Sequence, residues 1–116
     1  MIISRLKLTN FRNYKHLETE FGPNMNILIG NNAVGKTNIL ESISILALTK
    51  SYRNGIESDW IRFTREKATI QGRIINKKVI KNLKIDIFPN QKNIYVNQNN
   101  IHRLSDYISN LNVVIF

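Results

Sequence analysis

The pattern of apolar and polar positions begins with two short stretches of alternation. Ser4 to Thr9 and Leu17 to Phe21 alternate with a period of two, which is the period of a half-buried β-strand. We expect these two strands to pair as a hairpin. The connection from Asn10 to His16 is longer than a tight turn requires and is rich in side chains that bind anions or stack on bases. Its Phe11 and Tyr14 fit equally well as caps of the core.

A continuous apolar run and a helical stripe follow the hairpin. Met25 to Ile29 shows little alternation, as expected for a strand that is buried on both faces of an α/β sheet. A helix predicted to lie against the sheet has an apolar stripe of Ile39, Leu40, Ile43, Leu46 and Ala47, widened by Ile45 and Leu48. Glu57 to Phe63 predicts a short second helix. We expect its Trp60 in the core, because isolated aromatic side chains usually bury area.

The second half of the chain is predicted to be rich in strands. The expected strands form an antiparallel meander beside the α/β core: Ala68 to Ile75, Val79 to Phe88 and Asn93 to Val96. Leu104, Ile108 and Leu111 indicate a short helix, and residues 112–116 have the pattern of another strand. Because an uncovered apolar strand invites aggregation, we expect the sequence to be the N-terminal part of a longer protein.

The composition excludes several kinds of protein. With no cysteine among its 116 residues, disulfides and thiolate metal sites are excluded. No apolar run approaches the roughly 18 residues that a membrane-spanning helix needs, and the N-terminus lacks the pattern of a signal peptide. We therefore expect a cytoplasmic protein with no membrane partner.

The formal net charge of +9 is unevenly distributed. From residue 50 onward, twelve Lys and Arg stand against five acids, whereas the first 49 residues carry five against three. The excess predicts a polyanionic partner. The backbone of DNA or RNA is favoured, because Lys and Arg displace counterions from its phosphates. The alternative is a lysine-rich, solvated surface with no specific ligand.

The strongest chemical signal lies between the apolar run and the helical stripe. It fits the phosphate-loop pattern G-x-x-x-x-G-K-S/T and consists of Gly30, Asn31, Asn32, Ala33, Val34, Gly35, Lys36 and Thr37. The two glycines let successive backbone N–H groups curl inward around an anion. Lys36 can reach the β- and γ-phosphates, and the Thr37 hydroxyl is placed to coordinate Mg²⁺. The expected ligand is a Mg-nucleoside triphosphate.

Several segments resemble the RecF family of bacterial recombination and replication-repair ATPases. They run from Leu6 to Tyr14 (Leu-Lys-Leu-Thr-Asn-Phe-Arg-Asn-Tyr), from Gly30 to Asn38, over Leu40 and Glu41, and from Ser51 to Arg53, and the resemblance covers the whole chain. It implies an α/β P-loop fold in which residues 1–116 are the N-terminal part of an ABC-type ATPase head and residues 68–97 a β-rich subdomain. It also implies that ATP and Mg²⁺ are the cofactors and that Arg12 and Asn13 are candidate nucleotide contacts.

The same resemblance implies a function. Such a protein binds DNA in an ATP-dependent way, dimerises around two nucleotides, and acts with RecO and RecR to help RecA load at gapped DNA. In this family the acidic Walker B pair and the signature segment lie later in the chain. Catalytic residues therefore remain unassigned, and Glu41 is not given that role. We expect weak ATPase activity in the full-length protein and none from these 116 residues alone.

Other functions fit the sequence less well than this one. A P-loop GTPase is disfavoured, because two predicted strands precede the loop and the sequence has no Asn-Lys-x-Asp segment for reading guanine. The head of another chromosome-maintenance-type ATPase, or of a related nuclease, stays open. A nucleic-acid-binding module with a vestigial nucleotide loop is the alternative from a different class, and the intact motif argues against it.

Overall fold

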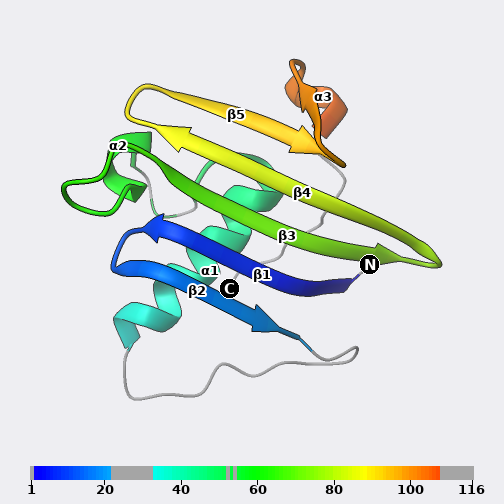
Figure 1. The fold of residues 1–116 in the computed structure, drawn as a ribbon, viewed down its shortest axis with the longest axis horizontal. Helices are drawn as coiled ribbons and strands as arrows, with labels where there is room; N and C mark the ends of the chain where they lie inside the picture. The colour runs from blue at the N-terminus through cyan, green and yellow to red at the C-terminus, as the bar shows by residue number, and fades with distance from the viewer. Residues whose placement is uncertain (1, 22–32, 52, 54, 108–116) are drawn as a thin grey trace.

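The computed structural model describes residues 2–21, 33–51, 53 and 55–107. Within these ranges the chain forms one twisted antiparallel sheet with helices packed against it (Figure 1). The long helix α1, Ala33–Leu48, lies behind the sheet and covers one of its faces. The other face is free of helices along the described strands β1 (Ile2–Phe11), β3 (Ala68–Asn76) and β4 (Val79–Phe88) (Figure 1). The predicted strands at residues 25–29 and 112–116 lie outside the described residues.

The predicted hairpin is confirmed, with longer strands than expected. Strand β1, Ile2–Phe11, pairs antiparallel with β2, Tyr14–Glu20. The prediction of a long connection from Asn10 to His16 was wrong, because Phe11 pairs with Tyr14 and only two residues form the turn. The aromatic pair that closes the hairpin explains the difference, since cross-strand pairs of this kind stabilise a sheet.

All six described strands belong to one sheet. Its order is β2-β1-β3-β4-β5-β6, so that the strands of the expected meander continue the sheet of the hairpin through the pairing of β1 with β3. These strands are β3, Ala68–Asn76, β4, Val79–Phe88, β5, Gln91–Val96, and β6, Asn99–Ile101. The first three confirm the predicted strands. The short β6 was not predicted, because its polar residues carry no alternation.

The core lies between α1 and the sheet. Its fully buried side chains come from both layers and include Leu6, Leu8, Ile45, Leu46, Ile70, Leu83, Ile85 and Ile87. Helix and sheet approach closely at Gly72 of β3, where an added Cβ would collide with Leu46 Cδ2. The prediction that α1 packs on the sheet is therefore confirmed. Leu48, which was expected to widen its apolar stripe, is instead 37% exposed.

Two short helices close the ends of this core. Helix α2, Glu57–Trp60, is shorter than predicted but buries Trp60, which confirms that Trp60 is a core residue. Helix α3, Leu104–Tyr107, buries Tyr107, whose hydroxyl donates a hydrogen bond to the carbonyl of Leu46 in α1. The other predicted residues of that last helix, Ile108 and Leu111, lie outside the described residues. None of the described helices is long and apolar enough to cross a bilayer.

Candidate nucleotide site

The long helix begins inside the phosphate-loop motif. The backbone of residues 33–36 forms the first turn of α1, and Thr37, whose side chain is half-buried, follows it. This first turn contains no acidic residue, so no carboxylate of the helix neutralises its positive end. Such an end is suited to binding a phosphate. Gly30, Asn31 and Asn32 lie outside the described residues, and the side chains of residues 33–36 are not described.

One turn further along α1, a carboxylate is completely buried. Glu41 is 0% exposed and receives two hydrogen bonds from the Arg12 guanidinium, from Nε to Oε1 and from Nη2 to Oε2 at 3.0 Å. Ser51 Oγ donates to Oε2 at 2.6 Å, and Arg53 Nη1 lies 3.7 Å from Oε1. A buried charge needs such partners, because burial without them is very costly. Glu41 thus fixes side chains from two other segments against the helix.

A chain of amide contacts extends this network toward the first turn of α1. Asn38, which is 4% exposed and directly follows Thr37, donates from Nδ2 to Asn13 Oδ1 at 2.7 Å. Its Oδ1 accepts a hydrogen bond from Arg53 Nη1 at 2.9 Å. The β1–β2 turn and the segment after α1 are therefore both attached to the helix beside the motif.

The same turn is held from its other side by the segment around α2. The backbone N–H of Arg12 donates to the carbonyl of Trp60 at 2.9 Å, and that of Arg62 donates to the carbonyl of Asn10 at 2.8 Å. Arg62 Nη1 also donates to the Asn13 carbonyl at 3.1 Å. These contacts explain how a two-residue turn keeps one conformation, including the positive φ of 48° at Arg12. The site is assembled from segments that are far apart in the sequence.

The structure places Arg12 and Asn13, predicted as candidate nucleotide contacts, beside the second turn of α1. The Arg12 guanidinium is bound to Glu41, and the Asn13 side chain is bound to Asn38. Sequence reasoning named Asn38 and the Ser51–Arg53 segment only as part of a resemblance and assigned them no role. Their polar side chains beside a nucleotide motif were the available signal. Among the described residues, no cluster of His, Asp and Glu could hold a metal ion.

Comparison with known families and proteins agrees with the motif. Residues 1–113 match the family described as "AAA ATPase domain". The chain is 42% identical over 116 residues to the "DNA replication and repair protein RecF" of Listeria welshimeri, and 43% identical over the same length to that of Oceanobacillus iheyensis. Both comparisons cover 100% of this chain. The chain spans 31% of the length of each of these curated relatives.

Solved structures show the same similarity in three dimensions. A structure described as "the recombination mediator protein RecF-ATP in RecFOR pathway" superposes with a TM-score of 0.90 at 28% identity, covering 99% of this chain and 32% of that one. A second, described with RecF-ATPrS, gives a TM-score of 0.84 over 91% of this chain and 29% of that one. The predicted fold class, an ABC-ATPase-like P-loop fold of the α/β type, is confirmed.

Proposed function

The chain belongs to the AAA ATPase domain family and is similar to RecF, and from this premise we propose that it is the ATP-binding part of a DNA-binding protein that acts in recombinational repair and replication restart. The observation that carries the proposal is the start of α1 inside the phosphate-loop motif. The cytoplasm is the proposed location. A vestigial loop is disfavoured, because the motif is intact in Gly30, Gly35, Lys36 and Thr37.

The residues present fit a Mg-ATP ligand. Gly30 to Thr37 are proposed to hold the phosphates through backbone N–H groups and Lys36, and the Thr37 hydroxyl is proposed as a Mg²⁺ ligand. The absence of acids from the first turn of α1 supports this assignment, because a carboxylate there would compete with the phosphates. When bound, Mg²⁺ would supply charge neutralisation between the phosphates.

The buried network is proposed to position this site. Glu41 holds Arg12 and Arg53 in place, and Asn38 holds the side chain of Asn13. Each of these contacts fixes a polar group next to the first two turns of α1 before ligand arrives. Preorganisation of this kind lowers the entropy cost of binding. The earlier assignment of Arg12 and Asn13 as nucleotide contacts stays a prediction.

The wider function rests on the RecF relatives. We propose that the full-length protein forms a homodimer around ATP, binds double-stranded or gapped DNA largely independently of sequence, and works with RecO and RecR to help RecA load. The excess of Lys and Arg in the chain supports DNA as a partner, because phosphate contacts dominate such affinity. The head of another chromosome-maintenance-type ATPase is the second candidate, since that group shares the motif.

A substitution of Lys36 tests the nucleotide proposal. In the full-length protein, Lys36→Ala should weaken ATP binding by about ten- to a hundredfold, because charge-assisted hydrogen bonds contribute about 1.5–3 kcal/mol. Lys36→Arg should retain binding but hydrolyse ATP poorly, since a planar fork replaces a compact ammonium. Equilibrium titration with a fluorescent ATP analogue measures binding by both variants, and a steady-state phosphate-release assay measures hydrolysis.

The matched control is Lys50→Ala, which removes an exposed lysine just beyond α1. It should bind the analogue like the wild type. Normal ATP binding by Lys36→Ala would contradict the assignment of residues 30–37 as the phosphate loop.

A further inference from the structure

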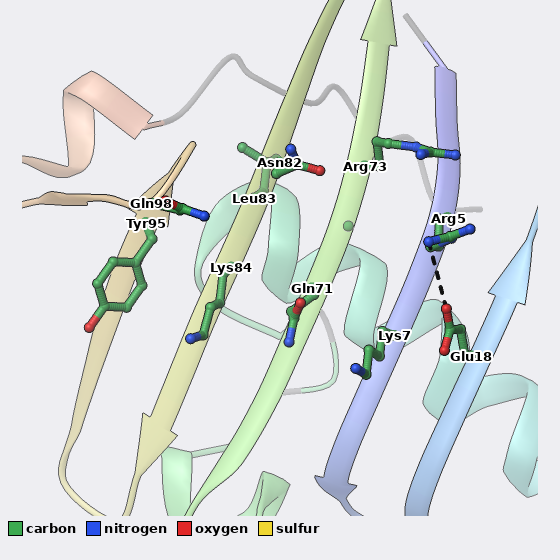
Figure 2. A pocket seen from close by; sticks show the side chains of 11 residues that line it. Arg5, Lys7, Glu18, Gln71, Arg73, Asn82, Leu83, Lys84, Tyr95 and Gln98 are labelled. Atoms are coloured by element: carbon green, nitrogen blue, oxygen red, sulfur yellow. Dashed lines mark ion pairs between the residues drawn. The ribbon is translucent and has the colours of Figure 1, made fainter.

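A groove of about 580 Å³ runs across the face of the sheet that is turned away from α1. Four cationic side chains line it, and they come from three adjacent strands: Arg5 and Lys7 from β1, Arg73 from β3, and Lys84 from β4. Tyr95 of β5 closes one end. Figure 2 shows these side chains projecting from the strands on the side opposite the helix.

The strand register arranges these residues in two parallel rows. In one row Lys7 lies opposite Gln71, Gln71 opposite Lys84, and Lys84 opposite Tyr95. In the other row Arg5 lies opposite Arg73 (Figure 2). Because neighbouring strands are about 4.8 Å apart, each row repeats at short, fixed intervals across the sheet. Such rows match an extended ligand that crosses the strands better than a small compact one.

The described acidic residues on this face all have cationic partners. Glu20 Oε1 accepts a hydrogen bond from Arg5 Nη2 at 2.7 Å, and Glu18 lies 3.8 Å from Arg5 Nη1. Asp86 pairs with Lys67 at 3.6 Å and with Lys84 at 3.8 Å, and it accepts a hydrogen bond from Thr69. Among the residues that the structure describes, no carboxylate of this face therefore lacks a cationic partner.

Two cations at the middle of the groove, Lys7 and Arg73, form no ion pair with a carboxylate among the described residues, although the charge of Arg73 contributes to lowering the pKa of Glu20. The side chain of Lys7 makes no hydrogen bond or ion pair within the described part of the chain, although Lys7 lies opposite Glu18 of β2. Within the described ranges, the Arg73 side chain donates a hydrogen bond only from Nε to Ser4 Oγ at 3.1 Å, which is a neutral partner. Like charges placed directly opposite each other, as in Arg5 and Arg73, are destabilising in a sheet. The buried Nε of Arg5 also lacks a partner among the described residues.

From this arrangement we propose that the groove binds the phosphodiester backbone of DNA. An anion that spans the groove would neutralise Lys7 and Arg73 and relieve the repulsion between the two arginines. The inference rests on the proposed DNA-binding function and adds the surface that performs it. Tyr95 is not a free stacking platform, because Lys84 Nζ lies 5.4 Å from the centre of its ring. Contact with the backbone, independent of sequence, is therefore expected.

The groove and helix α1, which begins inside the nucleotide motif, lie on opposite faces of the sheet, so that groove and motif can be tested separately. We expect the Lys7→Ala/Arg73→Ala double variant of the full-length protein to bind duplex DNA on the order of tenfold more weakly, with a log-log salt slope lower by about 0.9 per lost phosphate contact. Its affinity for ATP should be unchanged. Fluorescence anisotropy with duplexes of unrelated sequence, over a salt series with ATP present, measures the slope.

The matched control removes the same charges elsewhere. Lys78→Ala/Arg65→Ala takes away an exposed lysine and an exposed arginine outside the groove and should keep the wild-type slope. Lys7→Arg/Arg73→Lys retains both charges and should also keep it. Circular dichroism confirms that each variant is folded.

The outcomes separate this inference from the proposed function. If the wild type binds DNA and the groove variant has the same slope and affinity as its control, the assignment of the groove is overturned while the DNA-binding function stands. If the groove variant binds DNA normally but no longer binds an acidic protein that the wild type binds, the assignment of the groove to DNA is also overturned. If the wild type binds no DNA with ATP at low salt, the proposed function fails as well.

Discussion

The two faces of the sheet use the same alternation of residues for opposite purposes. On β1, Leu6 and Leu8 point to α1 and are fully buried, whereas Arg5 and Lys7 point to the open groove. On β3, Ile70 is buried beneath the helix while Arg73 lines the groove. Burial on one face supplies stability, and charge on the other forms the proposed DNA-binding surface. Substitutions on the two faces should therefore affect different properties.

Two arginine–carboxylate pairs, one buried and one exposed, allow this contrast to be tested. Arg12 binds Glu41, whose side chain is 0% exposed, while Arg5 binds Glu20, whose side chain is 69% exposed. The groups are chemically the same. Water and salt screen the exposed pair, whereas the buried carboxylate has no solvent to replace a lost partner. The two pairs should therefore respond very differently to the same substitution.

The largest expected effect follows from removing the buried partner. Arg12→Ala should lower the free energy of unfolding by about 3 kcal/mol, near the lower end of the usual cost of breaking a buried pair, because Ser51 and Arg53 still contact Glu41. Chemical denaturation followed by the fluorescence of the buried Trp60 measures this change. Arg5→Ala is the matched control and should leave the midpoint almost unchanged. Equal midpoints for the two variants would contradict the comparison.

A smaller effect is expected where helix and sheet touch. Gly72→Ala should cost about 1–3 kcal/mol of stability, which is typical of an overpacked core, because the new Cβ meets Leu46. Gln71→Ala, at the next position but on the open face, should cost much less. In a Leu46→Ala background the cost of Gly72→Ala should largely disappear, since the colliding side chain is gone. Additive costs in that double variant would show that contact with Leu46 is not the cause.

The sequence predicted the elements of this comparison better than the network between them. Alternation identified β1, β3 and β4 because each has one buried and one open face. It missed β6, whose residues are mostly polar. For α1 the apolar stripe was visible, but burial of Glu41 was not, because that depends on Arg12, which is 29 residues away in the chain. Partners distant in the sequence leave no periodic signal.

The cations that line the groove also could not be identified from the sequence alone. Charge counting predicted a polyanionic partner from the excess of cations after residue 50. Lys7 and Arg5 come from the less basic first part of the chain and reach the groove only through the pairing of β1 with β3. The relevant quantity is the charge left unpaired on one face, which requires the strand order.

The smallest expected effect concerns the exposed pair of Arg5 and Glu20, and it depends on pH. The hydrogen bond from Arg5, together with its charge, lowers the pKa of Glu20 below its usual value of 4.5. A carboxyl whose pKa is lower in the folded state adds stability above its unfolded pKa and loses that contribution as the pH falls through the folded pKa. Glu20→Gln should therefore be slightly less stable than the wild type near neutral pH, and the difference should vanish below the lowered pKa.

Because the pair is exposed, the difference should also vanish in about 1 M salt, where the screening length is about 3 Å. Thermal unfolding midpoints of both proteins, measured from neutral pH to about pH 3 at low and high salt, test this linkage. A large difference that survived high salt would mean that the open face contributes to stability as the buried face does.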